Sequence, residues 1–89
     1  MDRITERKIK ELQKILVLNR IKILQILIIE DTCVCQIVQK LGIKHNLISH
    51  HLKTLQGLGY IQSKRNGQHI IYNMVREKER SVEDLLKLI

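Results

Sequence analysis

Cys33 and Cys35 are the two side chains of this 89-residue sequence whose type and spacing most directly suggest chemistry. They stand at the start of a predicted helix, where the positive end of the helix dipole stabilises a thiolate. On a regular helix, positions i and i+2 point roughly 200° apart, so binding one ion through both sulfurs requires the first turn to unwind. Three interpretations stay open: a thiol site for a soft ligand, a redox pair, and two small half-buried apolar side chains.

A second set of polar side chains follows Gly42, on a helix whose apolar residues are expected to share one face: Leu47, Ile48, Leu52, Leu55 and Leu58. The opposite face then carries hydrogen-bonding side chains: His45, Asn46, Ser49, His50 and Lys53. These groups donate to and accept from base edges, and Lys53 neutralises a phosphate. The pattern predicts a DNA recognition helix, with His51 on its inner side making a hydrogen bond within the protein.

Three more helices are expected before this one. An amphipathic helix covers residues 4–16. A second helix over residues 19–30, capped by Asn19, carries apolar residues between Ile21 and Ile29 on almost every side and must be buried. A third helix, capped by Asp31 or Thr32, ends at Gly42. Together with the recognition helix it forms a predicted helix-turn-helix over residues 33–57.

After Gly57 the sequence pattern changes from the helical period to the alternation that is typical of strands. Two predicted strands flank the segment Arg65-Asn66-Gly67-Gln68, in which Asn66 and Gly67 both tolerate the positive φ of a tight turn. The resulting hairpin, residues 60–74, carries Lys64 and Arg65 at its tip and is a predicted wing. A last helix lies within residues 76–89, so the fold class is mainly α with a small β-hairpin, in winged helix-turn-helix order.

The charge distribution favours a polyanionic partner. The net charge is +7, and no Asp or Glu occurs between Thr32 and Val75, a window that also holds all four histidines. An enzyme is not expected, because no nucleophile–base arrangement and no Gly-rich phosphate loop is present. No signal peptide or membrane span is expected, so the protein is predicted to be cytoplasmic with reduced thiols.

The sequence resembles the ArsR/SmtB family of winged-helix repressors. The resemblance runs from Leu18 to Met74 and rests on four stretches: NRIKIL, TCVCQIVQKLGI, LISHHLKTLQGLGYI and NGQHIIYNM. It implies a homodimer through terminal helices, residues 1–18 and 76–89, that binds an inverted-repeat operator in double-stranded DNA. It also implies repression that ends when a metal ion or metalloid binds.

The resemblance assigns roles residue by residue. It implies base reading by His45, Asn46, Ser49 and His50 and phosphate contacts by Lys44 and Lys53, while Lys64, Arg65 and Gln68 of the wing contact the backbone or minor groove. Cys33 and Cys35 would hold As(III), Sb(III) or a soft divalent metal as effector, with no cofactor required. The position that carries a third thiol in some members is Val38, and the last helix lacks the histidine of an interfacial zinc site.

Two alternatives differ in function class. One is a ligand-independent or redox-controlled winged-helix DNA-binding protein, and the other is a winged-helix module that docks another protein. The acid-free window favours DNA, because a protein-docking module does not need every acid excluded from the helix-turn-helix and the wing.

Overall fold

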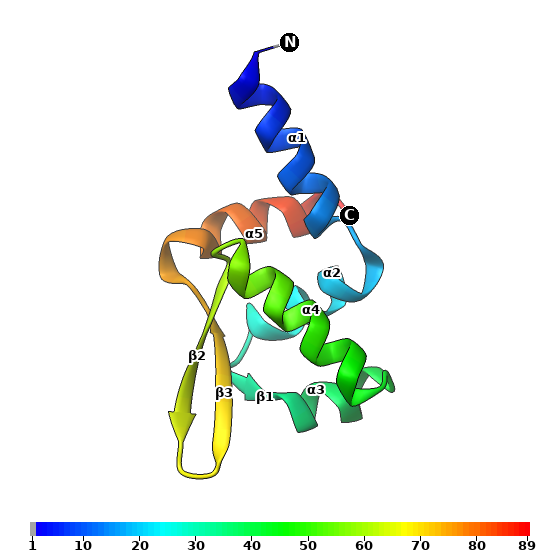
Figure 1. Ribbon diagram of the computed structural model, residues 1–89, viewed down its shortest axis with the longest axis vertical. Coiled ribbons are helices and arrows are strands. Elements are labelled where there is room, and N and C mark those ends of the chain that lie inside the picture. Colours follow the sequence, from blue (N-terminus) through cyan, green and yellow to red (C-terminus); the bar gives the residue numbers. More distant parts are fainter. Residues whose placement is uncertain (1) are drawn as a thin grey trace.

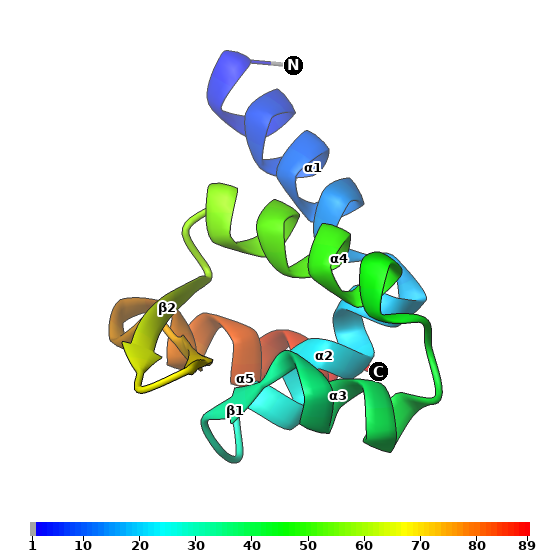
Figure 2. The same cartoon turned by 60° about the horizontal axis from the view of Figure 1, so that its bottom comes forward.

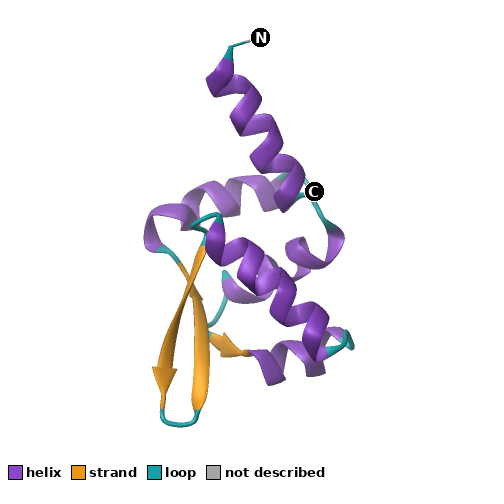
Figure 3. Cartoon of the chain, viewed as in Figure 1, coloured by secondary structure: helices purple, strands orange, loops and turns teal. Residues whose placement is uncertain are grey.

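The structure, a computed structural model, describes residues 2–89; Met1, the first residue of the predicted dimerisation segment, lies outside them. Its elements are α1 (Arg3–Ile15), α2 (Leu18–Leu27), β1 (Thr32–Cys33), α3 (Val34–Leu41), α4 (His45–Gly57), β2 (Ile61–Asn66), β3 (His69–Met74), a 3-10 turn (Arg76–Lys78) and α5 (Glu79–Lys87). The helices make up most of the molecule and the strands lie together at one side (Figure 3). The predicted fold class, a winged helix-turn-helix, is confirmed.

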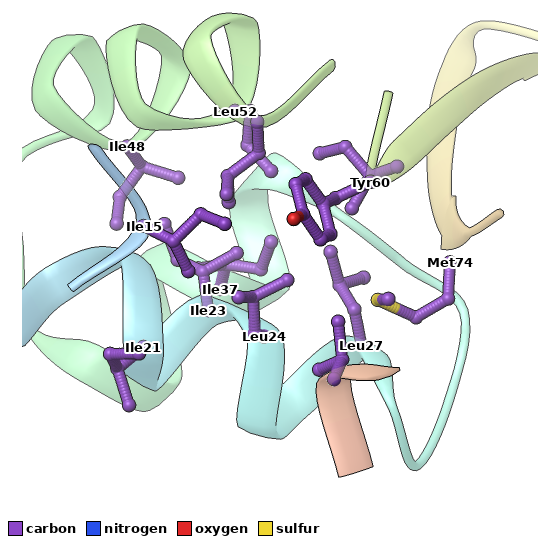
Figure 4. Packing of buried hydrophobic residues seen from close by; sticks show 13 residues of the cluster. Ile15, Ile21, Ile23, Leu24, Leu27, Ile37, Ile48, Leu52, Tyr60 and Met74 are labelled. Carbon is purple, nitrogen blue, oxygen red and sulfur yellow. The ribbon is translucent and has the colours of Figure 1, made fainter. Parts of the chain in front are cut away.

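The core is built from branched aliphatic side chains, because the sequence has no Phe or Trp. Four helices supply side chains with no exposed surface: Ile15 of α1, Ile23 and Leu24 of α2, Ile37 of α3, and Ile48, Leu52 and Leu55 of α4. Tyr60 and Met74 close the side that faces the hairpin (Figure 4). Full burial of each such aliphatic side chain contributes about 1.5–3 kcal/mol, so this cluster determines how α4 sits on α2 and α3.

Helix α1 extends away from this core toward the N-terminus (Figure 1). Asp2 caps it by accepting a hydrogen bond from the Thr5 amide at 2.7 Å. Only Ile15, in its last turn, is buried. Exposed apolar side chains line the rest of the helix and the residue after it: Ile4, Ile9, Leu12 and Leu16. The helix therefore presents an apolar edge that the described part of its own chain leaves uncovered.

Strand β1 is an element that the sequence did not predict. Thr32 pairs with Tyr72 and Cys33 with Ile71, which makes a three-stranded antiparallel sheet of order β1-β3-β2. Cys33 then becomes the N-cap of α3, so the predicted cap at Asp31 or Thr32 is wrong. Pairing with β3, distant in the chain, holds Thr32 and Cys33 extended and moves the helix start beyond both.

Two local expectations for α2 also differ from the structure. The helix begins at Leu18 with Val17 as N-cap, so the predicted Asn19 cap is wrong. Ile29 was expected on the buried helix but lies beyond its C-terminus and is 83% exposed. No helix among residues 2–89 has both the length and the apolar character needed to cross a lipid bilayer.

The predicted helix stop at Gly42 is confirmed. Gly42 has φ 66°, and its amide donates to the Val38 carbonyl at 2.8 Å. A left-handed residue at this position suits glycine because it has no β-carbon. The chain therefore leaves α3 sharply and starts α4 at His45.

Replacing Leu52 with Ala should lower the free energy of unfolding by about 2–5 kcal/mol, because the side chain is fully buried and leaves a cavity. Leu47→Ala is the matched control on the same helix: Leu47 is 46% exposed, so a change within about 0.5 kcal/mol is expected. Urea unfolding at one fixed protein concentration, followed by circular dichroism, measures both. Equal losses in the two variants would contradict this description of α4.

Candidate nucleic-acid interface

Helix α4 separates its two faces by the spacing of its apolar residues. Ile48, Leu52 and Leu55 recur at i, i+4 and i+7 and point into the core. The other side carries exposed side chains, His45, Asn46, His50 and Lys53, together with the half-buried Ser49. The predicted polar stripe is therefore present, with Lys44 exposed at its N-cap. DNA contact by these residues stays a prediction.

Leu47 departs from the expected apolar face. It is 46% exposed, whereas its neighbour Ile48 is fully buried. Successive side chains on a helix are rotated by about 100°. Because Ile48, Leu52 and Leu55 face the core, the preceding residue Leu47 faces away from it. Leu58, at the other end, is half-buried as the C-cap.

The hairpin returns toward the N-terminal end of α4. In Figure 1, β2 runs back from the C-terminus of α4, so the tip of the hairpin lies toward the same end of the molecule as α3 and the start of α4. Lys64 and Arg65 are exposed on β2, and Gln68 is exposed in the turn. The wing residues and the polar stripe of α4 therefore lie near each other.

The turn itself differs from the prediction. Asn66 pairs with His69, so the two-residue loop is Gly67-Gln68 rather than Asn66-Gly67. Gly67 has φ 65°, whereas Asn66 does not have a positive φ. Glycine at the first loop position supplies the left-handed conformation that a tight hairpin turn needs.

A contact that sequence reasoning missed links the wing to the recognition helix. The Gln56 Nε2 atom, near the end of α4, donates to Ser63 Oγ of β2 at 3.2 Å. Neither residue type signals this pairing, because it depends on how the chain turns between Gly57 and Tyr60. The hydrogen bond restrains the hairpin relative to α4.

The electrostatics of this surface follow from the acid-free window. The one ion pair among residues 2–89 joins Lys40 of α3 to Glu30. Lys44, Lys53, Lys64 and Arg65 therefore have no carboxylate partner in the described chain. Basic side chains that are not neutralised internally are available to phosphates.

His51 lies on the half-buried side of α4, as predicted, and makes a hydrogen bond within the protein. Its Nδ1 atom accepts from Arg20 Nε at 3.1 Å, and Arg20 also donates to the Lys14 carbonyl at 2.6 Å. Burial is the main cause that lowers the pKa of His51, and the positive charge of Arg20 and the neighbouring His50 add to it. The neutral imidazole thus links α4 to the junction of α1 and α2.

The cysteine pair spans the junction of β1 and α3. Cys33 is extended, with φ −96° and ψ 166°, and Cys35 lies in the first turn of α3. A disulfide joins them, with their Cα atoms 5.5 Å apart. The expectation that both cysteines belong to a helix and point apart is therefore wrong, because β1 keeps Cys33 out of the helix. The expectation of two reduced thiols is also not met in this structure.

Five predicted site residues meet at one cavity of about 330 Å³. Cys33, Cys35, His45, Ser49 and Gln68 all line it, from α3, α4 and the hairpin turn. The remaining predicted DNA residues lie outside this cavity on the exposed surface: Lys44, Asn46, His50, Lys53, Lys64 and Arg65. Within residues 2–89 there is no group of three or more His, Cys, Asp or Glu side chains that could hold a metal ion.

Comparison with known sequences gives a family and several relatives. The sequence profile described as bacterial regulatory protein, arsR family, matches residues 18–63. The cadmium resistance transcriptional regulatory protein CadC of Listeria innocua is 38% identical over 55 residues, which cover 61% of this chain and 46% of CadC. An uncharacterized HTH-type transcriptional regulator of Methanocaldococcus jannaschii is 32% identical over 57 residues, 64% of this chain and 61% of that protein. The match thus spans roughly half the length of these relatives.

Comparison with solved structures supports the same fold. HlyU from Vibrio cholerae has a TM-score of 0.84 at 21% identity, covering 99% of this chain and 97% of HlyU. Rv0081 of Mycobacterium tuberculosis has a TM-score of 0.87 at 19% identity, covering 98% of this chain and 88% of Rv0081. At such identities the likeness establishes the fold.

The hydrogen bond between Arg20 and His51 predicts a pH effect on stability. Because the pKa of His51 is lowered below 6.5, the unfolded chain binds its proton more readily than the native state. Stability should therefore fall as the pH drops through about 6.5 and stop falling below the native pKa. Histidine NMR titration should place the midpoint of His51 below 6.5, and Arg20→Ala should raise it. A midpoint at or above 6.5 would contradict the buried, Arg20-bonded imidazole.

Proposed function

Because this chain belongs to the arsR family of bacterial regulatory proteins, we propose that it is a sequence-specific DNA-binding transcriptional regulator of the cytoplasm. It acts as a repressor and leaves its operator when a thiophilic ligand binds Cys33 and Cys35. The observation that carries the DNA-binding part is the exposed polar stripe of α4 beside the basic hairpin, two elements that contain no Asp or Glu. Polar side chains on a helix read base edges in the major groove, and basic side chains hold phosphates.

The regulator works as a homodimer. The apolar edge of α1 supports this part of the proposal, since Ile4 is 70% exposed and Leu16 52% exposed. Leu88 and Ile89, after α5, add exposed apolar surface near the other end of the chain. We infer that a second copy of the chain covers both regions. A two-fold dimer places two α4 helices on an inverted repeat.

The two cysteines suit a soft ion that takes two thiolate ligands. Their Cα atoms lie 5.5 Å apart, and opening the disulfide leaves both sulfurs at the same edge of α3. A metalloid that needs three sulfurs finds only these two in the chain. Soft ions prefer thiolates, and the relation to CadC, named for cadmium resistance, supports an effector of this kind.

A second candidate is a redox-controlled DNA-binding protein. The disulfide between Cys33 and Cys35 is the observation that favours it. In this case opening and closing of the disulfide, rather than an ion, changes the junction between β1 and α3. Both candidates share the same DNA-binding surface and differ in what reaches the sulfurs.

The DNA-binding part is tested by fluorescence anisotropy with DNA from upstream of the gene, at several salt concentrations. His50→Ala should weaken binding by about 1–3 kcal/mol and relax the base preference, as loss of a base contact does. Lys64→Ala should weaken binding to every sequence and reduce the salt dependence. Lys22→Ala on α2, outside the proposed DNA-binding and dimerisation residues, is the control of equal charge and should bind like the unchanged protein. If neither His50→Ala nor Lys64→Ala changed DNA affinity, α4 and the wing would not be the interface.

The effector part is tested on the reduced protein bound to DNA. Cd²⁺ should release the DNA from the unchanged protein, because two thiolates suffice to hold a soft divalent ion. Cys33→Ser should keep DNA binding and lose this response. If the ion released DNA from Cys33→Ser as readily as from the unchanged protein, the cysteine pair would not be the ligand site. If the ion left DNA bound to the reduced protein but oxidation of the protein changed its DNA affinity, the redox candidate would be selected.

A further inference from the structure

The disulfide borders a cavity that opens between the two proposed DNA-binding elements. Cys33 and Cys35 form one wall, His45 and Ser49 of α4 a second, and Gln68 and Tyr72 of the hairpin a third. Its volume of about 330 Å³ is at the lower end of the range for small-molecule sites. A compact molecule held at the sulfurs therefore touches the first turn of α4 and the wing together.

We propose that Cys35 is a covalent modification site for a small anionic thiol, which opens the Cys33–Cys35 disulfide and remains attached to Cys35 in this cavity as a mixed disulfide. The group then lies between α4 and the wing and obstructs DNA. This last effect rests on the proposed DNA-binding function, whereas the modification site does not.

The two sulfurs differ in access. Cys33, at the end of β1 and paired with Ile71 of β3, is 8% exposed, whereas Cys35 in the first turn of α3 is exposed. Thiol–disulfide exchange requires the attacking thiolate to reach one sulfur directly. Attack therefore occurs at the Cys35 sulfur, and Cys33 is the leaving group.

The position of Cys33 favours its departure. It is the N-cap of α3, its side chain makes no capping hydrogen bond in the disulfide, and the first turn of α3 contains no acid. Free amides and the helix dipole at this end favour the negative charge that the departing sulfur takes.

The exchange step balances without an external oxidant. The incoming thiolate sulfur forms a bond to Cys35 Sγ, the Cys33–Cys35 bond breaks, and its electron pair stays on Cys33 Sγ as a thiolate. One disulfide is consumed and one is formed.

The surroundings select a negatively charged thiol. Two histidines, His45 and His69, line the cavity, and no Asp or Glu occurs between Thr32 and Val75. A carboxylate or sulfonate on the small molecule therefore meets imidazole, hydroxyl and amide groups and no carboxylate of the cavity wall. Once attached, its charge repels the DNA backbone as its body fills the space beside His45 and Ser49.

The modification site is tested with two single-cysteine variants of the full chain and the symmetrical disulfide of 2-mercaptoethanesulfonate. The remaining thiolate attacks this reagent, keeps one half and releases the other as a thiol. Intact-mass measurements should show that Cys33→Ser gains one adduct at least about tenfold faster than Cys35→Ser, because Cys35 is accessible. Cystamine, a cationic reagent of similar size, should react with Cys33→Ser more slowly than the sulfonate.

The unchanged, oxidised chain tests the direction of exchange. After brief treatment with one equivalent of 2-mercaptoethanesulfonate and an acid quench, peptide masses should place the adduct on Cys35 and a free thiol on Cys33. Equal or faster reaction of Cys35→Ser, an adduct on Cys33, or no preference for the anionic reagent would overturn the proposal.

The effect on DNA is read separately by anisotropy. Cys33→Ser carrying the sulfonate adduct should bind DNA at least about tenfold more weakly than the same variant carrying a neutral methylthio group on Cys35. Equal affinities of the two adducts would overturn the obstruction. If the unmodified protein did not bind DNA, the proposed function would fail, while the mass measurements would still decide the modification site.

Discussion

One helix has to belong to the core and to the proposed reading surface at the same time, and the rest of the structure depends on this constraint. Ile48, Leu52 and Leu55 of α4 are fully buried against α2 and α3. Since close-packed side chains leave little freedom of rotation, the core determines which side of α4 faces outward. Figure 2 shows α4 lying above α2 and α3. The hydrogen bond between Arg20 and His51 adds a polar restraint at the edge of the same contact.

Strand β3 transmits this arrangement to the wing and to the cysteines. It is the central strand, pairing with β2 in the hairpin and with β1 at Cys33. The base of the hairpin is also held by the Val75 amide, which donates to the Tyr60 carbonyl at 2.9 Å, and by Lys78, whose Nζ lies 5.1 Å from the centre of the Tyr60 ring. The wing is therefore a continuation of the folded core and not an isolated ribbon.

The position of the cysteine pair explains how thiol chemistry reaches the proposed DNA surface. The three proposed events, which are ion binding, a redox change and a covalent thiol adduct, share one place, where β1 ends and α3 begins beside the first turn of α4. A change at either sulfur alters a cavity that residues of the recognition helix and of the hairpin turn also line. The coupling needs no long pathway, because these elements already meet there.

The sequence by itself determined the features that neighbouring residues encode. Apolar spacing placed the polar stripe of α4 on the outside, Gly42 ended α3, and the change to alternation located the hairpin, because periodicity and backbone preference are local properties. Only the tertiary structure decided β1, the exposure of Leu47, the link from Gln56 to Ser63 and the disulfide. Each of these depends on contacts formed after the chain folds back on itself. The pairing of Thr32 with Tyr72 is the clearest case: nothing near Thr32 in the sequence signals a strand, and its partner exists only once the hairpin has returned to the start of α3.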